Sequence, residues 1–194
     1  MKHVVRWMYF NLAGRALTIV PQKVPTLLTG PGSLKLVPSE LKTLGASKPL
    51  IITDATLVKA GLSAKLEEIL SGAGFAYSVY DGVLPDPSFD ICSQALGVLK
   101  SSSCDSVIAL GGGSVIDTAK IVRMGATHSK PLERFSGLLT CRNSGLPFIA
   151  VPTTAGTGSE ATAAAVITDL KRHRKITALD PKMPPNTAIL DPVL

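Results

Sequence analysis

The sequence predicts an α/β fold built on a doubly wound, mainly parallel β-sheet. Short apolar runs alternate with segments in which apolar residues recur at helical spacing, from about residue 26 to the end of the chain. The segments between the runs have the roughly 10–15 residues that a crossover helix between parallel strands needs. Glycine- and proline-rich turns stand where several of the runs end. Together these observations are typical of repeated βαβ units.

The first part of the chain supplies three strands and two helices. Apolar residues at helical spacing mark one helix that starts at Ser33 and is closed by Gly45, and a second over residues 62–70 that is stopped by Gly72 and Gly74. Continuous or alternating apolar runs mark the strands, each bounded by turn residues. These strands are expected at residues 26–29, 49–53 and 75–80.

The later part of the chain repeats the alternation. Helical spacing predicts a helix over residues 88–100 and another that begins near Ser114. Strands are expected at residues 106–110 and 148–151, with later apolar runs at 163–167 and 187–190. Neither an internal repeat nor a boundary between two complete domains is visible. We therefore expect an N-terminal extension, residues 1–24, followed by one domain, residues 25–194.

The composition excludes several classes of protein. Of the 194 residues, 45% are hydrophobic and 18% are charged, so most of the chain is expected to be ordered. No apolar stretch approaches the roughly 18 residues that span a bilayer. Aromatic residues make up 5%, too few for a platform that stacks nucleic-acid bases. Three cysteines without Cys-x-x-Cys spacing favour a reducing compartment. We expect a cytoplasmic protein that binds neither nucleic acid nor membrane.

The net charge of +6 is concentrated near the N-terminus. Five basic residues and no acidic residue precede Glu40, so the remainder carries 15 bases and 14 acids, or +1. Residues 1–20 mix bases with apolar residues, a pattern compatible with an interfacial anchor or a targeting signal. The alternative, which we favour, is an ordinary extension of the domain.

A glycine-rich segment, Gly111-Gly112-Gly113-Ser114, follows a predicted strand and opens a predicted helix. Ligands of open parallel sheets bind beyond the carboxyl ends of the strands. Glycines let the backbone approach a bulky anion, and a helix start offers N–H donors, so phosphate or pyrophosphate suits this segment. It lacks the third glycine of the dinucleotide fingerprint and the Lys of a Walker loop. The alternative is a tight turn with a capping box formed by Ser114 and Asp117.

A second polar segment, residues 152–162, also follows a predicted strand. It carries five hydroxyl side chains and two glycines, more hydrogen-bonding capacity than a turn requires. Gly156, Gly158 and Ala161 match Gly-x-Gly-x-x-Ala, which is a weak signal alone. No Gly-x-Ser-x-Gly surrounds Ser159, which disfavours a hydrolase. The alternative is a helix N-terminus rich in capping residues.

Two charged features have both a binding and a structural interpretation. Asp54, at the end of a predicted strand, could accept hydrogen bonds from ribose hydroxyls and repel a 2′-phosphate. It could equally cap the helix that follows. Residues 171–175, KRHRK, are typical of a solvated charged hairpin, although one of them could reach phosphate or ribose.

These motifs resemble the iron-activated (group III) alcohol dehydrogenases. The matching segments follow the family's order from about residue 25 to the last residue, and residues 152–160, PTTAGTGSE, are the most specific. Glycerol dehydrogenases and dehydroquinate synthases share the Gly-Gly-Gly-Ser loop but usually differ in the Pro-Thr-Thr loop. The other matching segments are residues 30–33, 53–54, 80–83, 85–87, 111–114 with Asp117 and Lys120, 166–169, 180–182 and 190–192.

The resemblance implies a Rossmann-like first domain that binds NAD, in preference to NADP, and a helical second domain that holds a divalent metal, typically iron. By matching position it also implies a set of cofactor-binding residues. These are Asp54 for the adenosine ribose, Asp86 on the adenosine side, Gly111, Gly112, Gly113 and Ser114 for the pyrophosphate with Asp117 in the same segment, Thr153, Thr154 and Thr157 along the cleft, and Thr162, Val166 and Lys175 toward the nicotinamide ribose.

The implied reaction is reversible hydride transfer between an alcohol or aldehyde and NAD, with the metal polarising the substrate oxygen. The family's metal ligands, an aspartate and three histidines, lie downstream of residues 190–192, so no catalytic or metal residue is assigned here. We expect iron and a homo-oligomer only in a full-length form, and a cofactor-binding half that does not turn over alone. The alternative is a non-catalytic dinucleotide-binding module or a truncated gene product.

Overall fold

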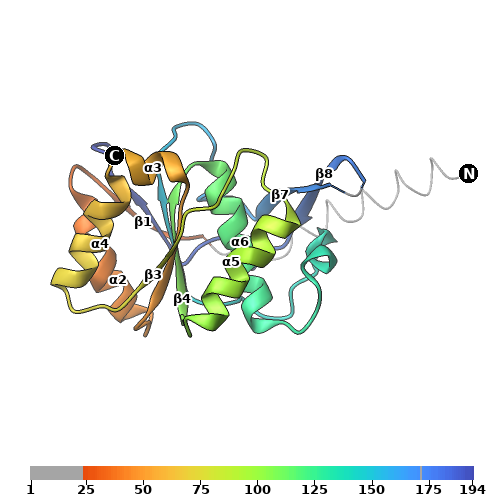
Figure 1. Ribbon diagram of the computed structural model, residues 1–194, viewed down its shortest axis with the longest axis horizontal. Helices are drawn as coiled ribbons and strands as arrows, with labels where there is room; N and C mark the ends of the chain where they lie inside the picture. Colours follow the sequence, from red (N-terminus) through yellow and green to blue (C-terminus); the bar gives the residue numbers. More distant parts are fainter. Residues whose placement is uncertain (1–23, 171) are drawn as a thin grey trace, which may run out of the picture.

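The computed structural model describes residues 24–170 and 172–194, so residues 1–23 of the predicted N-terminal extension lie outside the described residues. Within these residues the chain forms a six-stranded parallel sheet and a smaller three-stranded sheet (Figure 1). The predicted α/β fold with a mainly parallel sheet is confirmed. In spatial order the strands are β1 (Thr26–Thr29), β9 (Thr187–Leu190), β6 (Phe148–Pro152), β4 (Ser106–Gly111), β2 (Pro49–Ile52) and β3 (Ser78–Tyr80) in the larger sheet, and β5 (Gly137–Leu138), β8 (Arg174–Leu179) and β7 (Ala164–Asp169) in the smaller.

Helices cover both faces of the larger sheet, as a doubly wound fold requires. Helices α2 (Val37–Thr43) and α4 (Leu62–Gly72) lie on one face, and α5 (Phe89–Ser101) and α6 (Gly113–Thr127) lie on the other (Figure 1). No described helix is both long enough and apolar enough to cross a membrane. The shorter helices are α3 (Ala55–Lys59) and the 3-10 helices η1 (Ser33–Leu36) and η2 (Leu132–Phe135).

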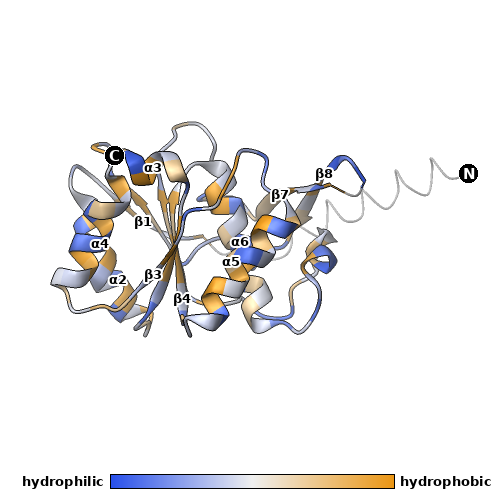
Figure 2. Ribbon diagram, in the orientation of Figure 1, coloured by the Kyte–Doolittle hydropathy of each residue, from blue (hydrophilic) through white to orange (hydrophobic). Residues whose placement is uncertain are grey.

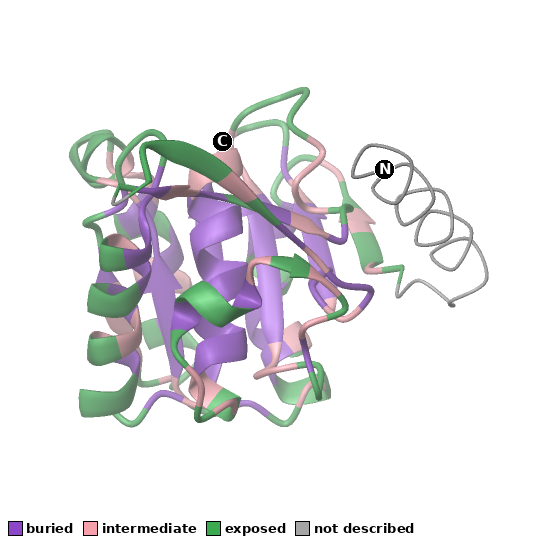
Figure 3. Ribbon diagram, turned by 90° about the vertical axis from the view of Figure 1, so that its right-hand side faces the viewer, coloured by how far each residue is buried: buried purple, intermediate pink, exposed green. Residues whose placement is uncertain are grey.

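Two apolar cores lie on the two faces of the sheet. Strands β2 and β4 are buried at every position, and their side chains alternate between the cores. Leu50 and Ile52 pack with α5 and α6, whereas Ile51 packs with α2 and α4. The central strands of the larger sheet are accordingly apolar in Figure 2 and buried in Figure 3. Helices α4 and α5 keep an exposed outer surface, whereas α6 is buried over most of its length. Continuous apolar runs are thus explained by strands that are covered on both sides.

Two local predictions differ from the structure. Strand β3 begins at Ser78 rather than at residue 75, because the N–H of Phe75 donates to the carbonyl of Leu70 and closes α4. Residues 153–163 form a loop that enters strand β7, so the interpretation of residues 152–162 as a helix N-terminus is wrong. The second sheet was not predicted as such, although β7 falls on the apolar run at 163–167 and the described residues 172–175 lie in an exposed charged hairpin.

The carboxyl ends of β1 and β9 are joined by the side chain of Asp191. Its Oδ1 accepts hydrogen bonds from the N–H groups of Gly32 and Val193, and its Oδ2 accepts one from Leu34 at 3.0 Å. Burial opposes ionisation of this carboxyl, but the three N–H donors outweigh it and hold the pKa of Asp191 below its usual range. The ionised carboxylate therefore stabilises the folded state.

Replacing Asp191 with alanine is expected to lower the free energy of unfolding by about 1–3 kcal/mol at neutral pH, because N–H donors lose their acceptor. A lowered folded-state pKa contributes stability above the unfolded value of about 3.9 and loses it as the pH falls through the folded value. The difference between wild type and variant in urea unfolding should therefore shrink below about pH 4. Asp81→Asn, at an exposed carboxylate, is the control, and an equal pH dependence of both variants would contradict the assignment.

Candidate functional site

Loops that were predicted separately meet at one edge of the larger sheet. Strands β2, β4 and β6 are adjacent and parallel, so their carboxyl ends coincide, with Gly111 paired to Pro152. A cleft of about 470 Å³ opens there. Its lining residues are Asp54, Ala55, Thr56, Leu57, Val83, Leu84, Pro85, Gly112, Gly113, Ser114, Val115, Thr153 and Thr154.

Helix α6 begins at the floor of this cleft. Its first residue is Gly113, its N-cap is Gly112, and no side chain caps it. The predicted capping box is therefore wrong, because Ser114 already lies inside the first turn and Asp117 turns away from the helix end. The positive end of a 15-residue helix thus opens at Gly113 and Ser114, both of which line the cleft. This arrangement favours a bound anion.

The glycines allow two loops to pack closely. A Cβ atom at Gly112 would lie 2.9 Å from the Oγ1 of Thr154, and one at Gly113 would lie 3.2 Å from the Oγ of Ser159. Both distances are shorter than ordinary van der Waals contact, so side chains at 112 or 113 would push residues 153–159 away. Thr157 also borders Gly113, at 3.5 Å from the same Cβ position. The two predicted loops therefore form one wall of the site.

Asp54 caps α3 and also lines the cleft. Its Oδ1 accepts hydrogen bonds from the N–H groups of Thr56 at 2.8 Å and Leu57 at 3.0 Å. The capping interpretation is therefore confirmed. The residue is half-buried. A carboxylate can accept further hydrogen bonds, so capping leaves it able to meet a ligand.

The cleft has an apolar wall that sequence reasoning missed. Leu57, Val83 and Leu84 line the cleft together with the glycines, and Leu84 is 61% exposed. An exposed leucine in a loop directly after a strand is the signal that could have identified this wall. Such a surface suits the flat face of an aromatic ring.

Asp117 does not line the cleft. It is 8% exposed, its Oδ1 lies 3.4 Å from the Nζ of Lys120, and its Oδ2 accepts a hydrogen bond from the N–H of Val166 at 2.9 Å. Burial raises the pKa of Asp117 and lowers the pKa of Lys120, and the attraction between the two groups opposes both shifts. The structure therefore places Asp117 behind the site, between α6 and β7.

The predicted residues of the nicotinamide side lie on and before the β7–β8 hairpin, outside the cleft. Lys175, whose side chain is 62% exposed, donates from its Nζ to Oδ1 of Asp86 at 2.6 Å. The N–H of Thr168 also donates to the carbonyl of Pro87, and this hydrogen bond connects the hairpin to the loop after β3. Thr162 accepts a hydrogen bond from Lys120, and Val166 is 39% exposed. The structure thus joins Asp86 to Lys175, which the sequence had placed at opposite ends of a cofactor.

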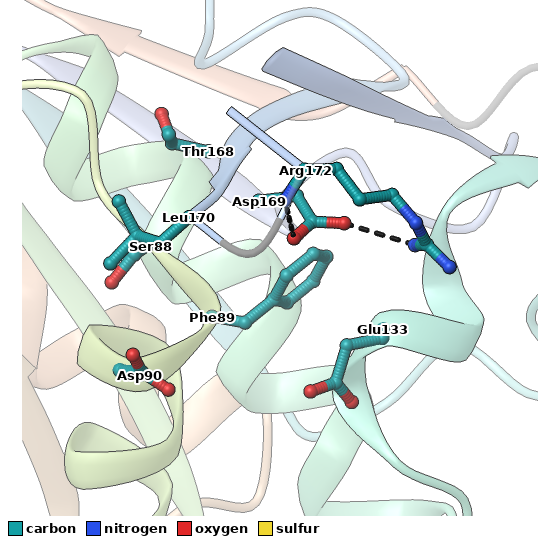
Figure 4. Close-up of a pocket in the computed structure, with 8 residues that line it drawn as sticks. All are labelled: Ser88, Phe89, Asp90, Glu133, Thr168, Asp169, Leu170 and Arg172. Carbon is teal, nitrogen blue, oxygen red and sulfur yellow. Dashed lines mark hydrogen bonds and ion pairs between the residues drawn. The ribbon is translucent and has the colours of Figure 1, made fainter. Parts of the chain in front are cut away.

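Other hollows lie near this edge, and two of them adjoin predicted site residues or the hairpin. One, of about 450 Å³, shares Thr153 and Thr154 with the cleft and extends along the ends of β6 and β9 to Leu194. The other, of about 290 Å³, lies at the start of α5 and shares no lining residue with the cleft. In it Arg172 reaches Asp169 at 3.0 Å (Figure 4). Its lining residues are Ser88, Phe89, Asp90, Glu133, Thr168, Asp169, Leu170 and Arg172.

The described residues do not fit a metal centre. Within residues 24–170 and 172–194, no three His, Cys, Asp or Glu side chains lie close enough together to hold a metal ion. The ring of His128 is engaged at both nitrogens, since Nε2 accepts the N–H of Arg142 at 2.9 Å and Nδ1 lies 2.8 Å from the carbonyl of Met124. No step through iron is therefore derived from these residues.

Comparison with known proteins identifies the family. Residues 25–192 match the family described as iron-containing alcohol dehydrogenase. The chain belongs to the iron-containing alcohol dehydrogenase family. It is 38% identical over 170 residues to the NAD-dependent methanol dehydrogenase of Bacillus methanolicus, a match that covers 88% of this chain and 45% of that protein. It is 39% identical over 166 residues to the lactaldehyde reductase of Escherichia coli K12, covering 84% and 43%. The chain thus spans less than half the length of these relatives.

Solved structures of family members share the fold. A 1,3-propanediol oxidoreductase matches with a TM-score of 0.86 and 33% identity, covering 89% of this chain and 46% of that one. A sulfoacetaldehyde reductase from Bifidobacterium kashiwanohense, solved in complex with NAD⁺, matches with a TM-score of 0.80 and 26% identity, covering 89% and 46%. The two sheets described here thus correspond to part of a longer oxidoreductase fold.

Proposed function

We propose that the cleft at the ends of β2, β4 and β6 binds NAD, and that this chain is the cofactor-binding part of an oxidoreductase acting on a small alcohol or aldehyde. The observation that carries the proposal is the uncapped start of α6, which opens into the cleft beside the Gly112–Gly113 backbone. A diphosphate is the anion that fits a helix N-terminus behind a glycine loop. The names of two relatives, an NAD-dependent dehydrogenase and an NAD⁺ complex, support the same cofactor.

The proposed pose assigns a task to each part of the cleft. Gly112, Gly113 and Ser114 hold the pyrophosphate through N–H groups of the first turn of α6. Asp54, at the far end, accepts hydrogen bonds from the adenosine ribose and favours NAD over NADP by repelling a 2′-phosphate. The apolar wall formed by Leu57, Val83 and Leu84 covers the adenine.

The nicotinamide half extends from the pyrophosphate along Thr153, Thr154 and Thr157. Thr162, Val166 and Lys175 of the neighbouring segment then approach its ribose. Bound NAD supplies the hydride acceptor, and the chain's own residues bind it, orient it and exclude water from one side. The alcohol or aldehyde and the implied iron belong to the proposal for a full-length protein.

The proposal predicts that the 194-residue chain binds NADH. A titration followed by nicotinamide fluorescence should give a saturable signal with a dissociation constant between about 1 μM and 1 mM, the usual range for cofactor and substrate sites. Competition by ADP should displace NADH, because both occupy the pyrophosphate and adenosine parts of the cleft. Absence of saturation at millimolar NADH would contradict the proposal.

A second measurement distinguishes the proposed oxidoreductase from the alternative, a binding module without turnover. Alcohol and NAD are added to the same preparation, with and without Fe²⁺, and formation of NADH is followed by absorbance. NADH formation would exclude a purely binding role for this chain.

A further inference from the structure

The side chain of Lys120 is completely buried and reaches away from its own helix. Its Nζ donates to the carbonyl of Ala164 at 2.5 Å and to the Oγ1 of Thr162 at 3.3 Å, in addition to its contact with Asp117. A buried ammonium needs such acceptors, since an unpaired charge in the interior is costly. Two of the three acceptors lie at or just before the start of β7. Lys120 therefore ties α6 to that strand.

Strand β7 is an edge strand, and this explains where the contacts fall. Within the smaller sheet it pairs with β8 on one side only, in the order β5-β8-β7, and its other edge meets backbone only near its end, where the N–H of Thr168 donates to the carbonyl of Pro87. On the opposite side, the carbonyl of Ala164 accepts from Lys120 and the N–H of Val166 donates to Asp117 at 2.9 Å. Successive outward groups on one edge of a strand are two residues apart. Asp117 and Lys120 thus serve the edge of β7 as a neighbouring strand would.

The same edge borders the proposed cofactor site. Thr162 and Val166 are both exposed and are both assigned here to the nicotinamide side. Asp117 and Lys120 lie one and two turns into α6, the helix whose first turn is assigned to the pyrophosphate. The two side chains therefore fix the distance between the part of the protein that holds the phosphates and the part that meets the nicotinamide ribose.

We propose that Asp117 and Lys120 are positioning residues: without touching the cofactor, they hold the outer edge of β7 in the register that aligns the nicotinamide half of NAD. This inference rests on the proposed function. Stability alone does not require a buried ion pair, because apolar residues of similar volume are often as stabilising in a buried site. A pair that forms hydrogen bonds with one N–H and one carbonyl of an edge strand instead fixes the position of that strand relative to α6.

Binding of NADH and of ADP to Lys120→Met tests the inference, because ADP lacks the nicotinamide half. We expect NADH affinity to fall about tenfold, as displacements of positioning elements commonly do, and ADP affinity to stay within about twofold. Lys120→Arg should recover part of the NADH affinity, since a guanidinium can still donate to the carbonyl of Ala164. Lys100→Met, at an exposed lysine on α5, is the matched control and should change neither affinity.

A second variant keeps the test decisive if Lys120→Met alone fails to fold. Asp117→Leu with Lys120→Met removes both charges together, which buried pairs tolerate better than the loss of one partner. This double variant should also lose about tenfold in NADH affinity and retain ADP. Unchanged NADH affinity, or an equal fall for NADH and ADP, would overturn the positioning role. Wild type that binds neither ligand would instead overturn the proposed function.

Discussion

Gly112→Val is expected to lower NADH affinity by more than about 100-fold, because a displacement of site residues by about 1 Å is enough for a loss of that size. The new Cβ would lie 2.9 Å from the Oγ1 of Thr154, so Thr154 must shift. The branched side chain would also stand at the N-cap of α6, where the proposed diphosphate approaches the backbone. Fluorescence titration with NADH and circular dichroism of the same sample measure binding and folding separately.

The control is the same substitution at a glycine with free space. Gly97 is exposed on α5, and no atom lies within 4 Å of a Cβ built there. Gly97→Val should therefore leave NADH affinity unchanged. A Gly112→Val protein that is folded and binds NADH like wild type would place the cofactor elsewhere.

A double variant separates the two causes of the Gly112 effect. Gly112→Ala alone introduces the close contact with Thr154, and Thr154→Ala removes the Oγ1 atom that makes it. Recovery of NADH affinity in the double variant would attribute the loss to displacement of the loop. Because Thr154 itself lines the proposed site, Thr154→Ala alone is the reference, and a loss larger than in that single variant would be attributed to the Cβ atom meeting the diphosphate.

The sequence predicted the position of the site better than the details of its residues. Parallel strands bring their carboxyl ends to one edge, so Asp54, Gly112 and Thr153 could be placed together from the order of elements alone. The alternative interpretation of Ser114 as a helix cap is wrong, because α6 begins one residue before Ser114. Gly113, the first residue of α6, packs closely against Ser159, a contact between distant residues that local sequence does not encode.

The burial of α6 could not be predicted from the sequence either. Asp117, Lys120 and Arg123 recur at i, i+3 and i+6 and so share one side of the helix. Such a polar stripe usually faces solvent. In the structure all three are buried: β7 covers Asp117 and Lys120, whereas Arg123 donates to the carbonyl of Pro184 and lies with its guanidinium 5.5 Å from the ring centre of Phe148. A contact made by residues about 45 positions later has no local signal.

Asp54→Asn should shift the ratio of NADH to NADPH affinity toward NADPH by about 10- to 100-fold, since a carboxylate and a phosphate a few ångströms apart near the surface repel by about 1.4–2.8 kcal/mol. Parallel titrations with the two cofactors measure the ratio. The amide oxygen of asparagine can still accept the N–H groups of Thr56 and Leu57, so the cap of α3 should survive.

Asp54→Ala distinguishes the charge from the cap, which one side chain combines here. Alanine removes both, so it should shift the cofactor ratio as far as asparagine does and, in addition, cost about 1 kcal/mol of stability through the lost cap. A variant with asparagine that keeps the wild-type ratio would mean that Asp54 only caps α3. Both variants lose the carboxylate, but only alanine also loses the hydrogen bonds to Thr56 and Leu57. If both shift the ratio of NADH to NADPH affinity equally while only alanine is less stable, the cofactor preference comes from the charge alone.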